Sequence, residues 1–231
     1  GVPGTEVTIN GRHLAEATAI YFGTVQAIPT TKDSTVVTVA VPYGVKSDFI
    51  RVVTPYGEVI SATKFEVPAP VFATGVEFDP SSAGAGERIT LYGQYFTGAT
   101  GVLFNGVAAD PATITFEEGK EDSEITVTVP NGATSGMLTV VTPAGEDVST
   151  NSFTVLGPQI LAIDHDNDGG TTTPAVEFSP AEGSVGTQVT IFGQYFTAVN
   201  EVLFNGVKAI SFTVVNDNQI TAAVPLGAST G

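Results

Sequence analysis

The sequence predicts an all-β protein of three tandem β-sandwiches, of which the first and the last are incomplete. Three observations lead to this prediction. Two long motifs recur in register, apolar and polar residues alternate with a period of two, and turn-forming residues separate the alternating runs. No segment shows a convincing period of 3.6 residues, so helices are not expected.

Internal repeats define the domain plan. The motifs GQYFT and VLFNGV occur at 93–97 and 102–107, and both recur unchanged 100 residues later. A more divergent copy lies 82 residues before the middle one, where VTING at 7–11 corresponds to ITLYG at 89–93. This self-similarity indicates that one folding unit is copied along the chain.

The repeats divide the chain into three domains and one linker. Repeat 1 covers 1–67 and is expected to lack its first strand, whereas repeat 2 covers 74–155 and is complete. An acidic linker occupies 156–173, and repeat 3 covers 174–231 and is expected to lack its last strands. Since missing strands would leave unpaired sheet edges, we expect that the parent chain continues in both directions or that a neighbouring copy donates the strands.

In repeat 2 the alternating pattern predicts about seven short strands. At 124–129, period two places Ile125, Val127 and Val129 on one face, which is expected to pack on the core. The strands are expected near 74–79, 87–92, 100–105, 112–116, 124–129, 137–142 and 152–155. Short strands joined by turns are typical of an antiparallel sandwich of two sheets.

Two local features support the same fold. The Asn-Gly pairs at 105–106 and 205–206 predict two-residue hairpin turns, because both residues tolerate positive φ angles. Phe96 and Phe196 of the GQYFT motifs are expected to cap the end of each sandwich by packing on its core.

Composition excludes several classes of function. The 231 residues carry 24 acidic and 8 basic side chains, a formal charge of −16, which disfavours binding to nucleic acid or to an anionic membrane surface. The absence of cysteine excludes disulfides, thiolate zinc sites and cysteine nucleophiles. No apolar run approaches the length needed to span a bilayer.

The motifs resemble those of a known family. GQYFT, VLFNG, ITAAVP at 220–225 and VVTPAG at 140–145 are similar to the IPT/TIG family of immunoglobulin-like domains, and the resemblance covers nearly the whole chain. It implies a seven-stranded sandwich of about 80 to 90 residues. Such domains occur in plexin-type receptors, in the dimerisation parts of some transcription factors and in bacterial surface and glycan-associated proteins, so the family does not imply one function.

The sharpest candidate site is the acidic segment DHDNDGG at 164–170. Asp164, Asp166 and Asp168 alternate as they do in calcium loops of the EF-hand and thrombospondin-repeat kind, which this segment resembles. Ala175 stands where an EF-hand has its bidentate Glu, and no helices are expected to flank the loop. Two interpretations remain open: a Ca²⁺ site that fixes the joint between repeats 2 and 3, or a solvated acidic linker.

A second acidic cluster lies in repeat 2. It consists of Glu117, Glu118, Glu121, Asp122 and Glu124. Paired carboxylates can act as the acid and base of a glycosidase, but they need a cleft and a fixed separation. No cleft is indicated, so a solvated hairpin loop is favoured.

The sequence does not predict an enzyme. Its two histidines, His13 and His165, lie in different modules, and no nucleophile elbow, P-loop or zinc motif is present. We therefore expect no catalytic and no cofactor-binding residues, with Ca²⁺ as the one possible bound ion.

Aromatic residues are the remaining candidates for binding. Tyr95 and Tyr195, together with Tyr92 and Phe192, are expected near one end of their sandwiches, where they could stack on sugar rings. Packing on the core or on a neighbouring domain is the competing interpretation.

These observations favour a non-enzymatic, extracellular structural or adhesive repeat array. It would serve as a spacer or fibre-forming segment of a larger bacterial surface protein, with neighbouring repeats or further copies of itself as partners. The alternative is a glycan-binding module of a surface protein that captures polysaccharide. No nucleic-acid partner and no membrane span are expected in this segment.

Overall fold

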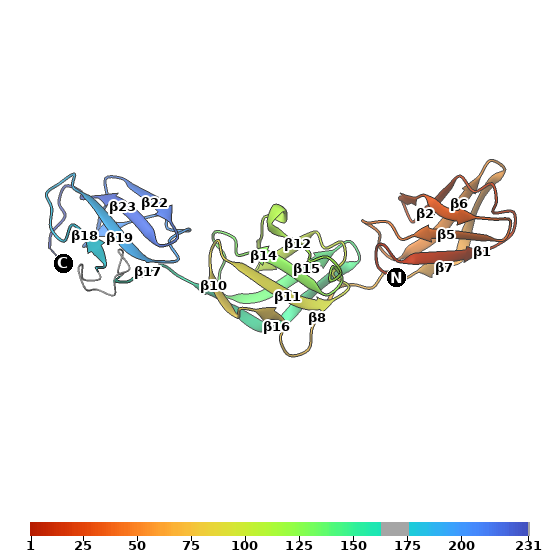
Figure 1. Ribbon diagram of the computed structural model, residues 1–231, viewed down its shortest axis with the longest axis horizontal. Helices are drawn as coiled ribbons and strands as arrows, with labels where there is room; N and C mark the ends of the chain where they lie inside the picture. The colour runs from red at the N-terminus through yellow and green to blue at the C-terminus, as the bar shows by residue number, and fades with distance from the viewer. Residues whose placement is uncertain (163–175, 231) are drawn as a thin grey trace. The chain divides into compact units, whose positions relative to one another are not determined.

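The computed structural model describes residues 1–162 and 176–230. Over these residues the chain is all-β, and the 3₁₀ turn Pro111–Thr113 is its single helical element. The strands form six sheets that belong to three separate sandwiches (Figure 1). The predicted all-β sandwich fold is confirmed.

Repeat 1 consists of two antiparallel sheets, with the orders β1-β5-β4 and β3-β2-β6-β7. Its strands are Glu6–Asn10 (β1), Ala19–Phe22 (β2), Val25–Ala27 (β3), Pro29–Lys32 (β4), Val36–Ala40 (β5), Asp48–Thr54 (β6) and Gly57–Phe65 (β7). Val37 and Val39 of β5 are fully buried, because alternate residues of a strand point to the same face. They belong to a core that also contains Leu14, Ile20, Phe22, Val41 and Val52.

Strand β1 lies at the edge of its sheet. It pairs with β5 along its whole length, from Glu6 opposite Ala40 to Asn10 opposite Val36. Among the described residues no strand pairs with its other edge. The hydrogen-bonding groups on that edge of β1 therefore face outward from the sandwich.

Repeat 2 has more strands than repeat 1. One sheet has the order β14-β11-β8, with β9 also paired to β11, and the other has the order β10-β16-β15-β12-β13. The strands are Val71–Phe72 (β8), Phe78–Asp79 (β9), Ser82–Gly84 (β10), Arg88–Gln94 (β11), Gly101–Phe104 (β12), Val107–Ala108 (β13), Glu124–Thr128 (β14), Gly136–Thr142 (β15) and Gly145–Leu156 (β16). The pair β10-β16 is parallel.

Three phenylalanine rings join the two sheets of repeat 2. Phe104 and Phe153 are fully buried, with their ring centroids 5.4 Å apart in an edge-to-face contact. Phe78 of β9 packs on Phe153 in the same way at 5.9 Å. Such contacts are favourable beyond the burial of area alone, so they help to hold β9 on the sandwich.

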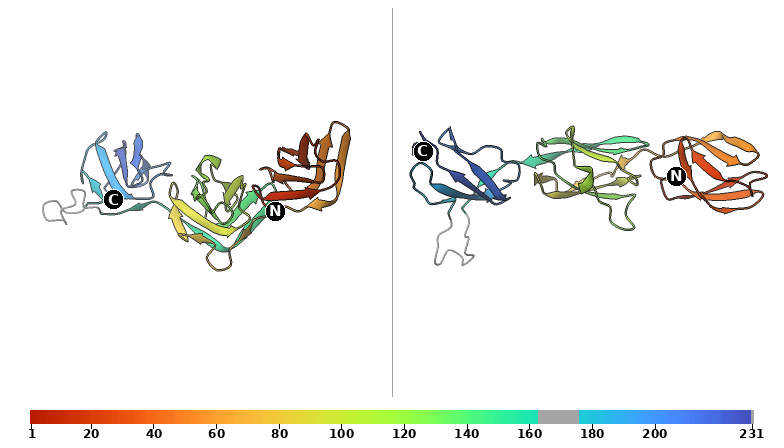
Figure 2. Two further views of the ribbon diagram at one scale, coloured as in Figure 1. Left: turned by 45° about the vertical axis from the view of Figure 1, so that its right-hand side comes forward. Right: turned by 90° about the horizontal axis from the view of Figure 1, so that it is seen from above.

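Repeat 3 has one four-strand path, β17-β19-β23-β22, with β18 also paired to β19, and a separate hairpin β20-β21. Its strands are Gln159–Ile160 (β17), Phe178–Ser179 (β18), Gln188–Gln194 (β19), Leu203–Phe204 (β20), Val207–Lys208 (β21), Phe212–Asn216 (β22) and Gln219–Ala223 (β23). Figure 2 shows the strands of repeat 3, in blue, in two further views. Phe178, which corresponds to Phe78, is 42% exposed.

The predicted hairpin turns are confirmed. Asn105 and Gly106 have φ angles of 47° and 86°, and the turn brings Phe104 opposite Val107. The pair at 205–206 has nearly the same angles, 44° and 83°. Both turns thus use the positive φ angles that Asn and Gly tolerate.

The strand predicted near 112–116 is wrong. The carboxylate of Asp110 accepts a hydrogen bond from the Ala112 N–H and caps the 3₁₀ turn, in which Pro111 takes an N-terminal position. Only one isolated bridge, between Thr115 and Thr126, remains in this range. A capping carboxylate followed by Pro favours a helical turn over a ladder.

Strand pairing also adjusts the residue ranges of the repeats. β8 at 71–72 precedes the range predicted for repeat 2, yet it pairs with β11. β17 at 159–160 lies inside the range predicted as a linker, yet it pairs with β19. These short strands join a sandwich through non-local pairing, which composition does not reveal.

Candidate functional site

The GQYFT motif and its counterpart in repeat 1 form a turn at the end of each sandwich. We call these turns the end loops, residues 11–17, 93–99 and 193–199. They contain both tyrosines that the sequence singles out as candidates for ligand binding.

Backbone hydrogen bonds hold the end loops in place. In repeat 2 the Gly93 N–H donates to the Ser123 carbonyl at 2.9 Å, and the Phe96 N–H donates to the Asp122 carbonyl at 3.1 Å. The other repeats contain the same bonds, namely Gly11 to Thr35, Leu14 to Ser34, Gly193 to Asn218 and Phe196 to Asp217. The loop is therefore a shared part of the fold rather than a feature of one repeat.

The residue before the buried cap has a left-handed backbone in every repeat. His13, Tyr95 and Tyr195 have φ angles of 59°, 62° and 61°. This conformation costs a residue with a side chain about 1 to 2 kcal/mol. Because His and Tyr adopt it equally, the loop imposes the conformation and the tyrosine ring does not.

The next residue is buried, as predicted for Phe96 and Phe196. Both rings are almost fully buried, and Leu14 takes the same place in repeat 1. A Cβ atom at Gly93 would overlap the Phe96 ring, which explains the glycine at this position. The predicted packing of these rings at the ends of the sandwiches is confirmed.

An aspartate ties down the end loop of repeat 3. The carboxylate of Asp217 accepts hydrogen bonds from the N–H of Tyr195 at 3.2 Å and from the hydroxyl of Thr197 at 2.7 Å. In repeat 2, Asp122 accepts the corresponding bond from the Thr97 hydroxyl at 3.0 Å. Each of these carboxylates accepts hydrogen bonds from the end loop of its own repeat. The carboxylate of Asp122 is therefore engaged by Thr97 and differs in this from the rest of the acidic cluster.

The candidate tyrosines occupy the surface of these rigid loops. Tyr95 is 36% exposed, and Tyr195 is half-buried. Tyr92 and Phe192 are half-buried in the preceding strands. Tyr95 thus presents its ring on a fixed corner, which is compatible both with ligand stacking and with packing. The ring of Tyr195 packs against Gly84, where a Cβ atom would overlap it.

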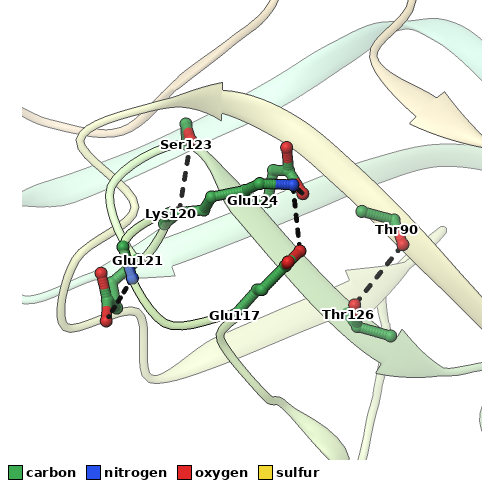
Figure 3. A network of polar contacts seen from close by, with 8 residues as sticks. Thr90, Glu117, Lys120, Glu121, Ser123, Glu124 and Thr126 are labelled. Atoms are coloured by element: carbon green, nitrogen blue, oxygen red, sulfur yellow. Dashed lines mark hydrogen bonds and ion pairs between the residues drawn. The ribbon is translucent and has the colours of Figure 1, made fainter.

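The acidic cluster of repeat 2 forms a loop that binds its own lysine (Figure 3). The Lys120 ammonium lies 3.0 Å from the Glu117 carboxylate and 3.2 Å from that of Glu124, and these hydrogen bonds raise the pKa of Lys120. Hydrogen bonds from backbone N–H groups, including that of Gly119, lower the pKa of Glu121. A general acid needs a raised pKa, so this arrangement favours a surface loop over a glycosidase pair.

The structure also contains a buried carboxylate that sequence reasoning missed. Glu77, next to β9, is only 4% exposed. Its carboxylate accepts hydrogen bonds from the N–H and hydroxyl of Thr150 at 2.8 and 3.0 Å, and from the N–H and side-chain amide of Asn151 at 2.7 and 2.8 Å. Burial alone would raise the pKa of Glu77, but these bonds outweigh it and lower the pKa.

A sequence signal for Glu77 does exist. The triplet Val-Glu-Phe at 76–78 recurs at 176–178, directly ahead of the glycine-rich stretch of each repeat. The residues that bind Glu77 lie 73 and 74 positions away, however, and only the fold brings them together.

The predicted metal ligands lie outside the described residues. Asp164, Asp166 and Asp168 fall in the range 163–175, which the structure does not describe, and so does His165, which was not predicted to bind metal. Among the residues that it does describe, no group of three or more His, Asp or Glu side chains is placed to hold a metal ion. Within residues 1–162 and 176–230, no helix is long and apolar enough to cross a membrane.

Comparison with known proteins identifies the family. The model of the IPT/TIG domain matches residues 1–67 and 176–231, which is more than half of the chain, so the protein belongs to the IPT/TIG family. The predicted resemblance is confirmed. None of the curated proteins matches the chain in sequence.

Several solved structures are similar at low identity. The protein SGBP-B from a xyloglucan utilization locus of Bacteroides uniformis is 16% identical, with a TM-score of 0.36 over 94% of this chain and 56% of that one. The surface glycan-binding protein PbSGBP-B from Prevotella bryantii is 16% identical, with a TM-score of 0.39 over 89% and 57%. The plexin A4 extracellular region is 16% identical, with a TM-score of 0.35 over 98% and 20%. The chain spans little more than half the length of the first two proteins.

Proposed function

We propose that this chain is a non-enzymatic, extracellular repeat array that acts as a structural spacer in a bacterial surface protein. The observation that carries the proposal is the use of buried polar side chains. Among the described residues these are Glu77, Thr142 and Ser149. Each of them binds the chain itself, so the buried polar groups of the sandwiches serve the fold.

The bonds of the two hydroxyl residues are local. The Ser149 hydroxyl accepts from the Leu138 N–H at 2.9 Å and donates to the Asn151 carbonyl at 2.8 Å. The Thr142 hydroxyl lies 3.2 Å from the Gly145 carbonyl, to which it donates. Satisfied polar groups of this kind rigidify a domain, which is the property that a spacer requires.

A second candidate function is glycan binding through the end loops. The observation that favours it is the exposure of Tyr95 on a corner whose backbone is fixed by hydrogen bonds. A preorganised aromatic ring loses little conformational entropy on binding, and its face can stack on a sugar. Tyr195 is half-buried against Gly84 and would offer only the uncovered part of its ring.

One experiment separates the two candidates. The whole chain and its Tyr95→Ala/Tyr195→Ala double variant are applied to a glycan array and to immobilised plant polysaccharides. If the chain is a spacer, neither the parent chain nor the double variant binds a glycan. Binding by the parent chain that falls at least tenfold in the double variant would replace the spacer with the glycan-binding function.

A matched control excludes a general effect of removing tyrosine. Tyr56→Ala changes a residue that is 90% exposed in the turn between β6 and β7 of repeat 1 and that is not part of an end loop. This variant must bind like the parent chain.

A further inference from the structure

The segment that enters repeat 2 and the strand that leaves it lie side by side. The entry segment, residues 71–84, contains β8, β9 and β10, and β16 is the last strand of the sandwich. β10 pairs with β16 in parallel, with Ser82 opposite Thr154 and Gly84 opposite Leu156. The chain therefore enters and leaves repeat 2 along neighbouring strands that point in the same direction.

Hydrogen bonds continue this contact beyond the β10-β16 ladder. The Phe72 N–H donates to the Asp147 carboxylate at 2.8 Å. The Glu77 carboxylate accepts from the N–H groups of Thr150 and Asn151 at 2.8 and 2.7 Å. Asp147, Thr150 and Asn151 all belong to β16, so polar bonds join the entry segment to this strand at two further levels.

An aromatic contact lies between the bonds of Glu77 and the ladder. The ring of Phe78 packs edge to face on that of Phe153 in β16, with the ring centroids 5.9 Å apart. Both rings are buried, and so is Glu77. In such a low-dielectric interior the hydrogen bonds of the carboxylate are stronger than they would be in water.

The contacts follow the same order along both segments. Residues 72, 77, 78 and 82–84 of the entry segment meet residues 147, 150–151, 153 and 154–156 of β16 in turn. Both series of numbers rise together, so the segments are aligned in parallel over their whole contact. A pull on the two ends of the repeat acts at the start of the entry segment and at the end of β16. It therefore loads all of these contacts at once, in shear.

The entry segment also connects the two sheets of the sandwich. β8 and β9 pair with β11 of one sheet, whereas β10 pairs with β16 of the other. Detaching the entry segment from β16 would thus remove a connection between the sheets as well as a strand. We expect this detachment to be the step that limits unfolding under a pull.

We propose that repeat 2 is a mechanical clamp, in which the entry segment and β16 resist tension along the chain. The clamp extends the proposed spacer function and rests on it, because a spacer joins two parts of a protein that can be pulled apart. The lifetime of a folded domain under force is set by its unfolding rate. Glu77 is a main polar contact of the clamp, because four donors bind its buried carboxylate.

Single-molecule pulling in two directions tests the clamp on the whole chain. The chain contains no cysteine, so handles can be attached at two introduced cysteines. Ala69→Cys/Pro158→Cys loads the contact from opposite ends, whereas Arg88→Cys/Pro158→Cys loads it from one end, so that its contacts break one after another. At the same constant force, repeat 2 should survive about tenfold longer or more with the first pair of handles. As a control, both handle variants must unfold in urea like the parent chain.

The variant Glu77→Gln tests the contribution of the buried carboxylate. It removes the charge that Thr150 and Asn151 bind, so the lifetime of repeat 2 in shear should fall about tenfold. Ile125→Ala is the matched control, because Ile125 is fully buried in β14, which pairs with neither the entry segment nor β16. This variant should lose at least as much stability in urea, yet its lifetime under force should change by less than about threefold.

Three results would overturn the clamp. They are equal lifetimes in the two pulling directions, an unchanged lifetime of Glu77→Gln, and an effect of Ile125→Ala as large as that of Glu77→Gln. If Glu77→Gln fails to fold, the two pairs of handles still decide the question with the contacts of the clamp intact. Binding of a glycan in the array experiment would replace the spacer function but would not alter the lifetimes under force, so the two failures are distinguishable.

Discussion

Repeats 1 and 2 share one frame but differ at one sheet edge. In repeat 2 the segment around β9 brings Phe78 and Glu77 onto the sandwich, where a ring and four hydrogen-bond donors receive them. In repeat 1 the rings of Phe22 and Phe65 also pack edge to face, but β1 pairs only with β5 among the described strands. The comparison indicates that alternating apolar residues form the two sheets of each sandwich, whereas the short strand β9 adds to the burial of the core.

The largest expected difference concerns the central phenylalanine. Phe153→Ala should destabilise repeat 2 by about 3 to 5 kcal/mol, because it removes a fully buried ring and its two aromatic contacts. Phe65→Ala should destabilise repeat 1 by about 2 kcal/mol or less, since its ring is half-buried. Hydrogen exchange of peptides from β15 and β6 measures the two effects separately. Equal losses would contradict the proposed difference in burial.

The buried carboxylate should produce the next largest effect. Glu77→Gln keeps the shape but removes the charge that four donors recognise, so repeat 2 should lose about 1 to 3 kcal/mol. Glu177→Gln is the matched control, because Glu177 is exposed in repeat 3 and its replacement should change stability by less than about 0.5 kcal/mol. Urea unfolding, followed through peptides that are specific to each repeat, measures the loss of stability in both variants. A loss in repeat 3 as large as that in repeat 2 would refute the role of the Thr150 and Asn151 donors.

The same group predicts how the stability of repeat 2 depends on pH. Hydrogen bonds lower the pKa of Glu77 in the folded state, so its contribution is present above the unfolded pKa of about 4.3 and is lost as the pH falls through the lower folded value. The parent chain should therefore lose more stability than Glu77→Gln between pH 6 and pH 3. Parallel pH profiles for the two proteins would show that the carboxylate contributes nothing.

A smaller effect should separate two substitutions in the end loop. Tyr95→Ala and Tyr95→Gly both remove the ring, but only glycine adopts the φ angle of 62° without strain. The glycine variant should be more stable than the alanine variant by about 1 kcal/mol. Thermal unfolding of the two variants checks this value. Equal stabilities would mean that the loop relaxes to another conformation.

The smallest expected effect on the sandwiches is that of Ca²⁺. One of the two interpretations of the acidic segment is that Asp164, Asp166 and Asp168 bind one ion, and in that case isothermal titration calorimetry detects it. Exchange rates in β11 and β19 should not change on addition of Ca²⁺, because the prediction places the ion outside the sandwiches. The triple Asp→Asn variant should bind no ion. A parent chain that also binds none would leave the acidic segment as a linker.

Local features of the fold were predictable from particular residues. The Asn-Gly pairs specify hairpins because their backbone preferences act over two residues. Gly93 stands three residues before Phe96, where a Cβ atom would overlap the Phe96 ring. The strand near 112–116 was mispredicted because Asp110 and Pro111 stabilise a 3₁₀ turn that the alternating pattern conceals. That Tyr95 and Tyr195 have a left-handed backbone at the corners of the end loops became clear only from the structure, because the motif does not predict this φ angle.

By itself the sequence determined that the chain is all-β, that it consists of repeats of one domain and where its tightest turns lie. These properties follow from period-two alternation and from turn residues, both of which act over a few positions. Only the tertiary structure decided that Glu77 binds residues 73 and 74 positions away and that Ile50 is more exposed than Leu138. Burial and buried hydrogen bonds depend on which distant strand covers an edge, and no local pattern encodes that choice.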